Sequence, residues 1–570
     1  MPLMGSLYIG NSGLTTSQNA LNTTAHNMSN ADTKGYVRQQ ILLGTSIYNT
    51  INTNKDAVSN QQIGLGVTFE KTRQVRDYFL DQTYRREVGR SAFYEVSSDA
   101  LSEVENLLDE MNGESFQESI SNLWTSVQEL AKDPSSAVTQ GLFVERCSEF
   151  LSRAQSVYGG LCDYQSNLNL TVKKDVETIN NYANRIKTLN DEIRNIECGK
   201  FESANDLRDV RNQLVDELAA FANITYSEDI DGSVCIQMEG EDLVKRDVVY
   251  EIGLYEDPKT GFYTPYWVKN AKLPSGDNGK RTYEDIEGAK VFDMNRIISS
   301  DLNTDVGSLK SSMLARGDHK ADYTDLMEDG RYNNSISQSV VMNIQAEFDQ
   351  LVHGIATAIN GVIADAATSA AKANAADRNY LCDSNGNPIQ VFQKIASDGY
   401  VKQADGTYKY MDEEKGTLNA DGSISGYVNE TLYTTTNMLI NQQLIQQPTM
   451  INFVKSDKSV DFETMEKMKK AFSDENTTLN PNVKKKSSFN DYYGDLVSQV
   501  ANSGSVYKSI LSNQQETVDT TFSAREQVIG VSQDEELTNM IKFQNAYNAA
   551  SRYINVINEM LEHVINTLAI

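Results

Sequence analysis

The end of the chain has the most regular pattern of hydrophobic positions. From Met540 onward, apolar or small residues recur at alternating steps of three and four, which predicts one helix over about 533–569. The positions are Met540, Phe543, Tyr547, Ala550, Ile554, Ile557, Leu561, Val564 and Leu568. A stripe that continues over about four heptads is typical of a coiled coil. We therefore expect this helix to bury its stripe against a partner.

The start of the chain has a matching pattern. Apolar positions alternate there with two amides, at Met4, Leu7, Asn11, Leu14, Gln18, Leu21, Ala25 and Met28. Residues 1–31 contain no Asp, Glu, Lys or Arg, whereas a helix on the surface of a monomer normally carries charge on its outer face. We therefore expect the terminal helices to pair as a coiled coil, and the other faces of the first helix to meet further protein. A helix that packs only on its own domain is the alternative.

Between the ends, the pattern predicts a mainly α protein with inserted β domains. Helical periodicity begins at about Asp77 and continues, with breaks, to Phe221. It returns at 335–363 and again at 489–522, and a helical bundle would bury so many one-sided helices. After Ile224 the hydrophobic positions alternate with polar ones, which predicts strands.

These segments predict a nested domain organisation, because helices from both ends of the chain must meet. The expected domains are a terminal coiled-coil domain (1–45 and 530–570), a helical core (46–222, 306–365 and 432–529), a β-rich insertion (223–305) and a smaller β or loop insertion (366–431). Residues 63–67 are a further short β-like element, and residues 435–480 are ambiguous.

Composition excludes several classes of partner. The chain has 570 residues and a formal net charge of −28, which argues against nucleic acid because phosphate binding needs a basic face. No stretch approaches eighteen consecutive apolar residues, so we expect no membrane contact or span. The N-terminus lacks a basic region followed by an apolar core, so we expect no cleaved secretory signal.

The sequence offers little for catalysis or for binding of metals and cofactors. The five cysteines are widely spaced without a CxxC pair, and the four histidines lie far apart. Asp229–Gly232 resembles the start of a calcium loop but lacks the later ligands, and Gly64-Leu65-Gly66 lacks a third glycine and a following helix. We expect no catalytic site, no metal and no cofactor. Arg316-Gly317-Asp318 matches an integrin-binding tripeptide that often arises by chance.

Two motifs at the ends of the chain carry a family resemblance. The residues Asn27, Asn30, Thr33, Gly35, Tyr36 and Arg38 resemble the N-terminal signature of the bacterial flagellar axial proteins, which are rod, hook and hook-associated proteins. Ser29 and Lys34 depart from that signature. The run Phe543–Arg552, followed by Glu559-Met560-Leu561, resembles the C-terminal signature of the same family.

The middle of the chain is similar to the hook-associated members that form the first hook–filament junction. The similar segments are 63–67, 208–218, Gly307-Ser308-Leu309, 348–360 and 491–497. The resemblance weakens over 240–305 and 366–480.

The resemblance implies a structural subunit that polymerises with its own copies in a helical ring and has no catalytic role. It implies the flagellar hook protein and the second hook–filament junction protein as neighbours, and an export chaperone on the C-terminal helix in the cytoplasm. The protein would leave the cell through the flagellar type III apparatus and become part of the extracellular flagellum. The expected assembly interface comprises Leu7, Leu14, Leu21, Asn27, Met28, Asn30, Gly35, Tyr36, Met540, Phe543, Tyr547, Ile554, Ile557, Leu561, Val564 and Leu568.

Three alternatives remain at this point. The first is a hook or distal rod protein of the same family, and the second is a secreted coiled-coil adhesin. The third is an enzyme whose site lies in the 366–431 insertion.

Overall fold

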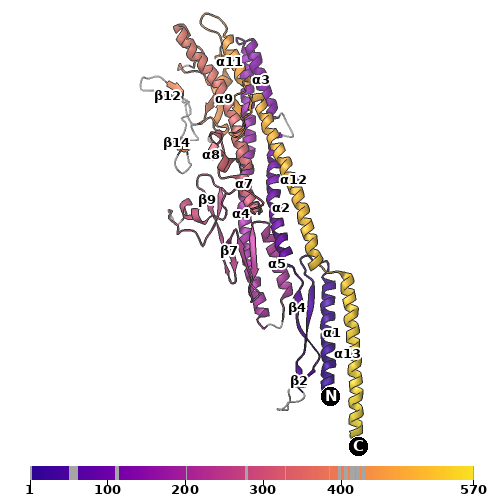
Figure 1. The fold of residues 1–570 in the computed structure, drawn as a ribbon. Helices are drawn as coiled ribbons and strands as arrows, with labels where there is room; N and C mark the ends of the chain where they lie inside the picture. Colours follow the sequence, from indigo (N-terminus) through magenta and orange to yellow (C-terminus); the bar gives the residue numbers. More distant parts are fainter. Residues whose placement is uncertain are drawn as a thin grey trace.

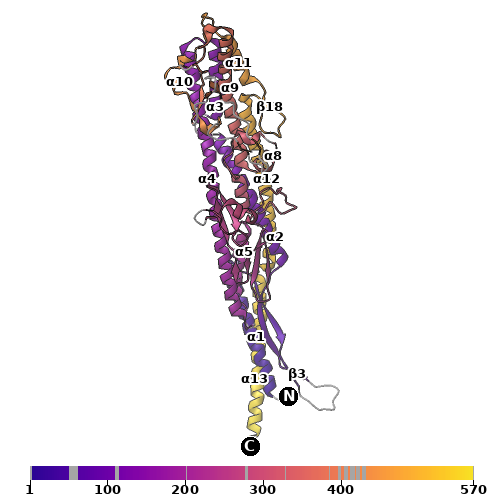
Figure 2. The same cartoon turned by 90° about the vertical axis from the view of Figure 1, so that its left-hand side faces the viewer.

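The computed structural model is a long, narrow molecule in which both chain ends lie at the same tip (Figures 1 and 2). It describes residues 3–50, 62–109, 115–199, 202–276, 280–327, 329–383, 386–395, 400–402, 408–410, 417–418, 424–425 and 432–568. A terminal unit forms one end, a helical body forms the other, and a β-rich insertion lies against one side of the body. The expected fold class, mainly α with inserted β domains and paired terminal helices, is confirmed.

Long helices dominate the chain. The helices are α1 (Leu3–Ser29), α2 (Tyr78–Asp109), α3 (Phe116–Lys132), α4 (Ala137–Glu197), α5 (Asn205–Ala219), α6 (Tyr283–Ile286), α7 (Ser308–Arg316), α8 (Asp329–Arg331), α9 (Val340–Ala373), α10 (Gln442–Gln446), α11 (Phe462–Ser473), α12 (Phe489–Ile529) and α13 (Gln533–Leu568). Serine side chains cap several of them: Ser136 accepts a hydrogen bond from the Val138 amide at the start of α4. The segment 435–480, whose sequence pattern was ambiguous, contains the helices α10 and α11.

The strands form small sheets between the helices. They are β1 (Gln39–Thr45), β2 (Tyr48–Thr50), β3 (Gln62–Gly64), β4 (Val67–Gln74), β5 (Ile224–Glu228), β6 (Val234–Met238), β7 (Glu241–Lys245), β8 (Val248–Val249), β9 (Ile252–Glu256), β10 (Tyr263–Trp267), β11 (Phe392–Lys394), β12 (Tyr400–Lys402), β13 (Tyr408–Tyr410), β14 (Thr417–Leu418), β15 (Ile424–Ser425), β16 (Met438–Ile440), β17 (Thr477–Thr478) and β18 (Lys486–Ser487). The largest sheet has the order β5-β6-β7-β8, and β9 pairs with β10 beside it.

Two hydrophobic cores hold the body together. The larger core joins α3, α4, α9, α11 and α12 around the packed rings of Phe116, Phe348 and Tyr493. The smaller core joins the second half of α4, helix α5 and the β5–β10 strands, with Trp267 among its fully buried side chains. The 61-residue helix α4 contributes to both cores and so ties the β-rich insertion to the bundle.

Helix α9 differs from its expected extent. The sequence predicted an end near residue 363, but the helix continues through the alanine-rich run to Ala373 because that run favours helix and buries Ala367 and Ala370. By length and hydropathy α9 is the one described helix that would pass as a membrane span. Its Ile344, Phe348 and Leu351 side chains instead fill the larger core. The predicted insertion 366–431 is described in part: residues 366–373 belong to α9, and the short strands β11 to β15 lie in the rest.

The β-rich insertion is attached through a narrow neck. Its two connecting segments run side by side, because the Ser308 amide donates to the Ala220 carbonyl at 2.9 Å and the Leu309 amide donates to the Phe221 carbonyl at 3.2 Å. The Gly307 amide donates to the Gly89 carbonyl of α2 at 2.8 Å. The insertion is therefore fixed to the body at two points of the backbone.

Candidate assembly surface of the terminal helices

Helices α1 and α13 lie side by side and antiparallel at the tip of the molecule (Figure 1). Their closest approach is at two glycines of α1. A Cβ on Gly10 would lie 2.7 Å from Cγ1 of Ile554, and a Cβ on Gly13 would lie 3.6 Å from Cβ of Ala550. The helices therefore pack closely through small residues, as helices do when one surface carries no bulky side chain.

The residues of α1 that contact α13 lie one sequence position before the residues of the predicted stripe. Apart from buried Thr16, the buried positions of α1 are small or polar and follow the same heptad spacing: Ser6, Gly10, Ser17, Ala20, Thr24 and Asn27. The predicted residues Leu7, Leu14, Leu21 and Met28 are only half-buried and flank this line. The hydrophobic pattern missed the line because it gave no weight to Gly, Ser and Thr, which let two helices come close.

The open face of α1 carries no charge. Met4 is 71% exposed and Tyr8 is 56% exposed, and Asn11, Gln18 and Ala25 are exposed beside them. These are the remaining members of the predicted stripe, apart from Tyr8. A solvent-facing helix surface without any charged side chain is unusual for a soluble monomer.

On α13 the predicted stripe faces the partner helix. Ile557 is buried, and the predicted residues Met540, Phe543, Tyr547, Ile554 and Leu561 are half-buried. Val564 is 38% exposed, and the side chain of Leu568 lies outside the described residues. Further apolar side chains of α13 are exposed: Leu537, Ile541, Val556, Met560 and Ile565. Tyr553 is 41% exposed, but its ring lies against Gly10 of α1.

The last two turns of α13 extend past the start of α1. Because Gly10 lies at Ile554 in an antiparallel pair, the first residue of α1 reaches only about as far as Leu561. Residues 562–567 are all exposed. This end of α13, with Val564 and Ile565 exposed, thus has no cover from α1.

The N-terminal signature forms a turn within the subunit. The Asn27 side chain acts as a peptide-like bridge, since its Nδ2 donates to the Gln39 carbonyl at 2.9 Å and its Oδ1 accepts from the Gln39 amide at 3.0 Å. The Tyr36 hydroxyl donates to the same Oδ1 at 2.7 Å, and Asn30 accepts a hydrogen bond from Thr33. Gly35 has a φ of 82° beside Gln213. These four predicted interface residues shape the turn that leads α1 into β1.

Arg38 joins the terminal unit to the body. Its amide donates to the Ile529 carbonyl at 2.8 Å, at the end of α12. Its guanidinium pairs with Glu535 at 2.8 Å and with Glu536 at 2.9 Å, both in the first turn of α13. Negative charge in the first turn of a helix is also favourable to the helix dipole. Arg38 therefore fixes the bend between α12 and α13.

A chain of alternating charges continues into the body from this bend. Arg525 of α12 contacts Asp81 at 2.7 Å and Asp216 at 2.8 Å. Arg76 pairs with Asp81 at 2.9 Å, and Arg85 pairs with Asp216 at 2.6 Å. All five side chains are largely buried, so each charge depends on its neighbours for compensation. The chain links α2, α5 and α12 where the terminal unit leaves the body.

Asp209 is a buried carboxylate at the same junction. Its oxygens accept from the Val37 amide at 3.3 Å and from Nε2 of Gln74 at 2.6 Å. Burial raises the pKa of Asp209 to about 7, despite these hydrogen bonds and the positive charge of Arg76. Nearby Asp206 raises it further.

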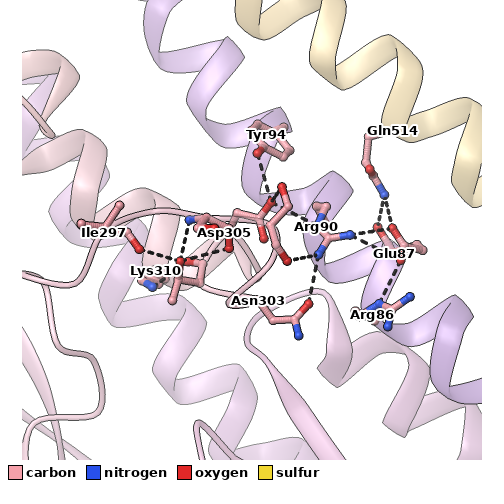
Figure 3. A network of polar contacts seen from close by, with 12 residues as sticks. Arg86, Glu87, Arg90, Tyr94, Ile297, Asn303, Asp305, Lys310 and Gln514 are labelled. Carbon is pink, nitrogen blue, oxygen red and sulfur yellow. Dashed lines mark hydrogen bonds and ion pairs between the residues drawn. The ribbon is translucent and has the colours of Figure 1, made fainter.

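A second polar network lies in the body, where α2, α7 and α12 meet (Figure 3). Oδ2 of buried Asp305 accepts from Nε of Arg90 at 3.1 Å and from the Tyr94 hydroxyl at 3.0 Å. Nε2 of Gln514, on α12, donates to Glu87 of α2 at 2.8 Å. Burial and the Asp305 charge raise the pKa of Tyr94 to about 12. The network fixes the register of α12 along α2.

The described residues contain no group of three or more His, Cys, Asp or Glu side chains arranged to hold a metal ion. The Arg316-Gly317-Asp318 tripeptide cannot present its arginine to a receptor. Arg316 is 3% exposed and donates to Oδ1 of Asn169 at 2.5 Å. This tripeptide therefore gives no support to the adhesin alternative.

Comparison with known proteins shows which sequences this chain resembles. The family model for the flagellar hook-associated protein FlgK helical domain matches residues 101–376. Flagellar hook-associated protein 1 of Bacillus subtilis (strain 168) is 25% identical over 564 residues, which cover 98% of this chain and 97% of that protein. The protein of the same name from Salmonella typhimurium is 25% identical over 576 residues, 97% of this chain and 98% of that protein. Over nearly its whole length the chain is therefore similar to flagellar hook-associated protein 1.

Two further family models match the terminal unit of this hook-associated protein 1 relative. The flagella basal body rod protein model matches residues 7–36, which are α1 and the signature turn. The flagellar basal body rod FlgEFG protein C-terminal model matches residues 528–568, which are the bend and α13. The part matched by these two models is therefore the paired helices, the turn up to Tyr36 and the bend before α13.

The fold agrees with the similarity to flagellar hook-associated protein 1. The flagellar hook junction protein FlgK from Burkholderia pseudomallei matches with a TM-score of 0.53 and 12% identity, over 79% of this chain and 100% of that chain. These similarities identify the chain as a structural component of the bacterial flagellum. The family is not enzymatic.

Proposed function

We propose that this protein is a structural subunit of the hook–filament junction and polymerises with its own copies through α1 and α13. The observation that carries the proposal is the unprotected surface of the terminal unit. The open face of α1 has no charge, and the end of α13 exposes apolar side chains beyond its partner. Neighbouring copies would cover both.

The energetics favour a polymer built from many small contacts. Burial of one Leu or Ile side chain contributes about 1.5–3 kcal/mol. Half-buried Leu7, Leu14 and Leu21 and exposed Val564 can each bury more surface against a neighbour. Several such residues per copy would stabilise a ring in which each pairwise contact is weak.

The proposed interface consists of two groups of residues. The residues that would hold α1 and α13 together and border the open faces are Leu7, Leu14, Leu21, Met28, Met540, Phe543, Tyr547, Ile554, Ile557 and Leu561. Val564 and Leu568 follow beyond the start of α1 and would meet a neighbouring copy. Asn27, Asn30, Gly35 and Tyr36 would act indirectly, because their contacts orient α1 relative to the body. The terminal unit would form an inner tube, with the body and then the β-rich insertion outside it.

We also propose the partners and the route of the protein. The flagellar hook protein and the second hook–filament junction protein would be its axial neighbours. An export chaperone would cover α13 in the cytoplasm, where its apolar outer side would otherwise be exposed. Export would use the flagellar type III apparatus, to the outside of the cell.

Deletion of residues 540–570 tests the proposal. We expect a strain that carries this deletion to assemble hooks and to export flagellin, but to lose attached filaments and motility. Leu21→Asp and Ile557→Asp should also abolish incorporation into flagella, while the body still folds. A motile strain with normally attached filaments would contradict the proposed function. Immunogold labelling of isolated flagella should place the protein at the end of the hook, whereas labelling along the hook or rod would support the rod or hook alternative.

A further inference from the structure

A two-stranded hairpin lies beside α1, on the side away from α13 (Figure 1). Strand β1 pairs with β4 in antiparallel register, from Gln39 opposite Gln74 to Thr45 opposite Val67. Within the described residues this sheet has no third strand. None of the residues in either strand is buried. A hairpin with no buried side chain is only marginally stable by itself and needs cover.

The two edges of this hairpin are protected unequally. β4 carries Glu70, Lys71 and Arg73, whereas residues 39–54 contain no Asp, Glu, Lys, Arg or Pro. Natural sheets guard open edges with charged side chains, with proline or with a covering element. The β1 edge has neither charge nor proline, although a bulge lies between Leu42 and Leu43 on its pairing with β4. The β1 edge can therefore accept another protein segment as a cover.

Apolar side chains are exposed along the same strand and just after it. Leu43 is 46% exposed, Ile47 is 81% exposed and Tyr48 is 53% exposed. Surface apolar residues scattered singly need no explanation, but three within six positions of an uncharged edge form a patch. We call Leu43, Ile47 and Tyr48 the β1 patch.

The hairpin that carries the β1 patch packs on α1. The hairpin contacts α1 where the Val67 amide donates to Oγ of Ser12 at 3.3 Å, and a Cβ on Gly66 would lie 3.4 Å from Cα of Ile9. The segments 1–31 and 39–54 are both without Asp, Glu, Lys and Arg. A partner that covers the open face of α1 would therefore reach a surface of the same character on the hairpin.

We infer that the β1 patch and the open edge of β1 bind a second copy of this chain, as a contact separate from the helix pairing. The inference rests on the proposed function, since it assumes that copies assemble around the terminal unit. A second copy offers a matching surface on the outer side of α13, where Ile541 and Val556 are exposed. Between them, only Lys542 and Arg552 are charged.

Leu43→Glu and Ile47→Glu test the contact, with Thr68→Glu as the matched control. All three add one negative charge to an exposed position of the same hairpin, but Thr68 lies on β4. The variants would replace the native protein in cells, and the exported protein would be divided into the fraction on flagella and the fraction in the medium. We expect Leu43→Glu and Ile47→Glu to lower the flagellar fraction about tenfold or more, and Thr68→Glu to change it less than about threefold.

Cross-linking identifies the partner. In Leu43→Cys, a maleimide–benzophenone reagent attached to the introduced thiol and irradiated on isolated flagella should give an adduct of twice the mass of this chain that is absent from the parent protein. An adduct with the hook protein, or with another axial protein instead, would overturn the inference. So would normal incorporation of Leu43→Glu and Ile47→Glu.

Failure of this inference can be told apart from failure of the proposed function. If Ile557→Asp blocks incorporation while both hairpin variants assemble normally, only the hairpin contact is wrong. If the parent protein is absent from the junction altogether, the proposed function fails first. Circular dichroism and thermal unfolding of each purified variant would show that the body still folds.

Discussion

The amide of Gly307 donates a hydrogen bond of 2.8 Å to the carbonyl of Gly89, and this contact fixes the β-rich insertion to α2. Both positions require glycine. A Cβ on Gly89 would lie 2.5 Å from the Ala219 carbonyl oxygen. A Cβ on Gly307 would lie 2.5 Å from the Phe221 carbonyl oxygen, and the φ of Gly307 is 100°. The two segments of the neck therefore pass so close to α2 that no side chain fits between them.

Gly89→Ala and Gly307→Ala should each destabilise the body by about 2–3 kcal/mol, because backbone atoms must move to make room. Urea unfolding followed by circular dichroism would measure the loss. Gly141→Ala is the control: it lies in α4 with nothing within 4 Å of its Cβ, so it should be neutral or stabilise slightly. Equal stability of all three variants would contradict the close contact at the neck.

The sequence predicted the layout of the molecule more completely than its contacts. Apolar periodicity located the long helices and the paired termini, because those helices bury one face and the pattern reports burial. It could not extend α12 from 522 to Ile529, since the end of that helix is fixed by Arg525 and its carboxylate partners and not by apolar side chains. Pairwise ionic contacts between segments far apart in sequence leave no periodic signal.

The interface between α1 and α13 illustrates a second limit. The leucine stripe at Leu7, Leu14 and Leu21 gave the correct spacing, but the contact is centred on Gly10 and Gly13. A glycine gains its importance from what approaches it, and that depends on the partner helix. The signature residues Asn27 and Tyr36 could likewise be recognised from their motif, while their role in a turn followed only from their hydrogen bonds.

Gly10→Leu should separate the terminal helices, whereas Gly5→Leu should not. A Cβ at Gly10 would lie 2.7 Å from Ile554, but nothing lies within 4 Å of a Cβ at Gly5. Both substitutions place a good helix former in α1, so helix propensity is matched. Amide hydrogen exchange of the purified monomer would report the pairing. We expect faster exchange throughout α1 and α13 in Gly10→Leu, and identical exchange in the two variants would refute the packing.

Arg525→Met should weaken the junction between the terminal unit and the body. The substitution leaves Asp81 and Asp216 buried with one cation fewer, and removal of one partner from a buried ionic cluster typically costs about 3–5 kcal/mol. Thermal unfolding and limited proteolysis near the bend would detect the effect. Lys132→Met removes an exposed ion pair with Glu129 and should change stability by less than about 0.5 kcal/mol. A similar, small effect of both variants would mean that the buried chain of charges contributes little.

Asp209 should make the stability of the junction depend on pH. Its pKa is raised to about 7 by burial, whereas the same carboxyl in the unfolded chain titrates near its ordinary value of about 3.8. Between these values the folded state holds a proton that the unfolded state has lost, so stability falls as pH rises from about 4 to about 7. The groups that face this carboxyl are Arg76, Asp206, Gln74 and the Val37 amide.

Asp209→Asn removes this titration. Compared with the parent, the variant should lose less stability between pH 5 and pH 8, by about 1–3 kcal/mol, because the amide stays neutral throughout. Its absolute stability at pH 5 should be slightly lower, since the amide nitrogen cannot accept the hydrogen bond from Val37. Buried Glu347 and Asp349 also have pKa values raised to about 7, so the parent will retain some pH dependence from the body in either case. Parallel urea unfolding curves at the two pH values isolate the contribution of Asp209, and an unchanged pH slope in the variant would show that this carboxyl is already ionised in the folded protein at pH 5.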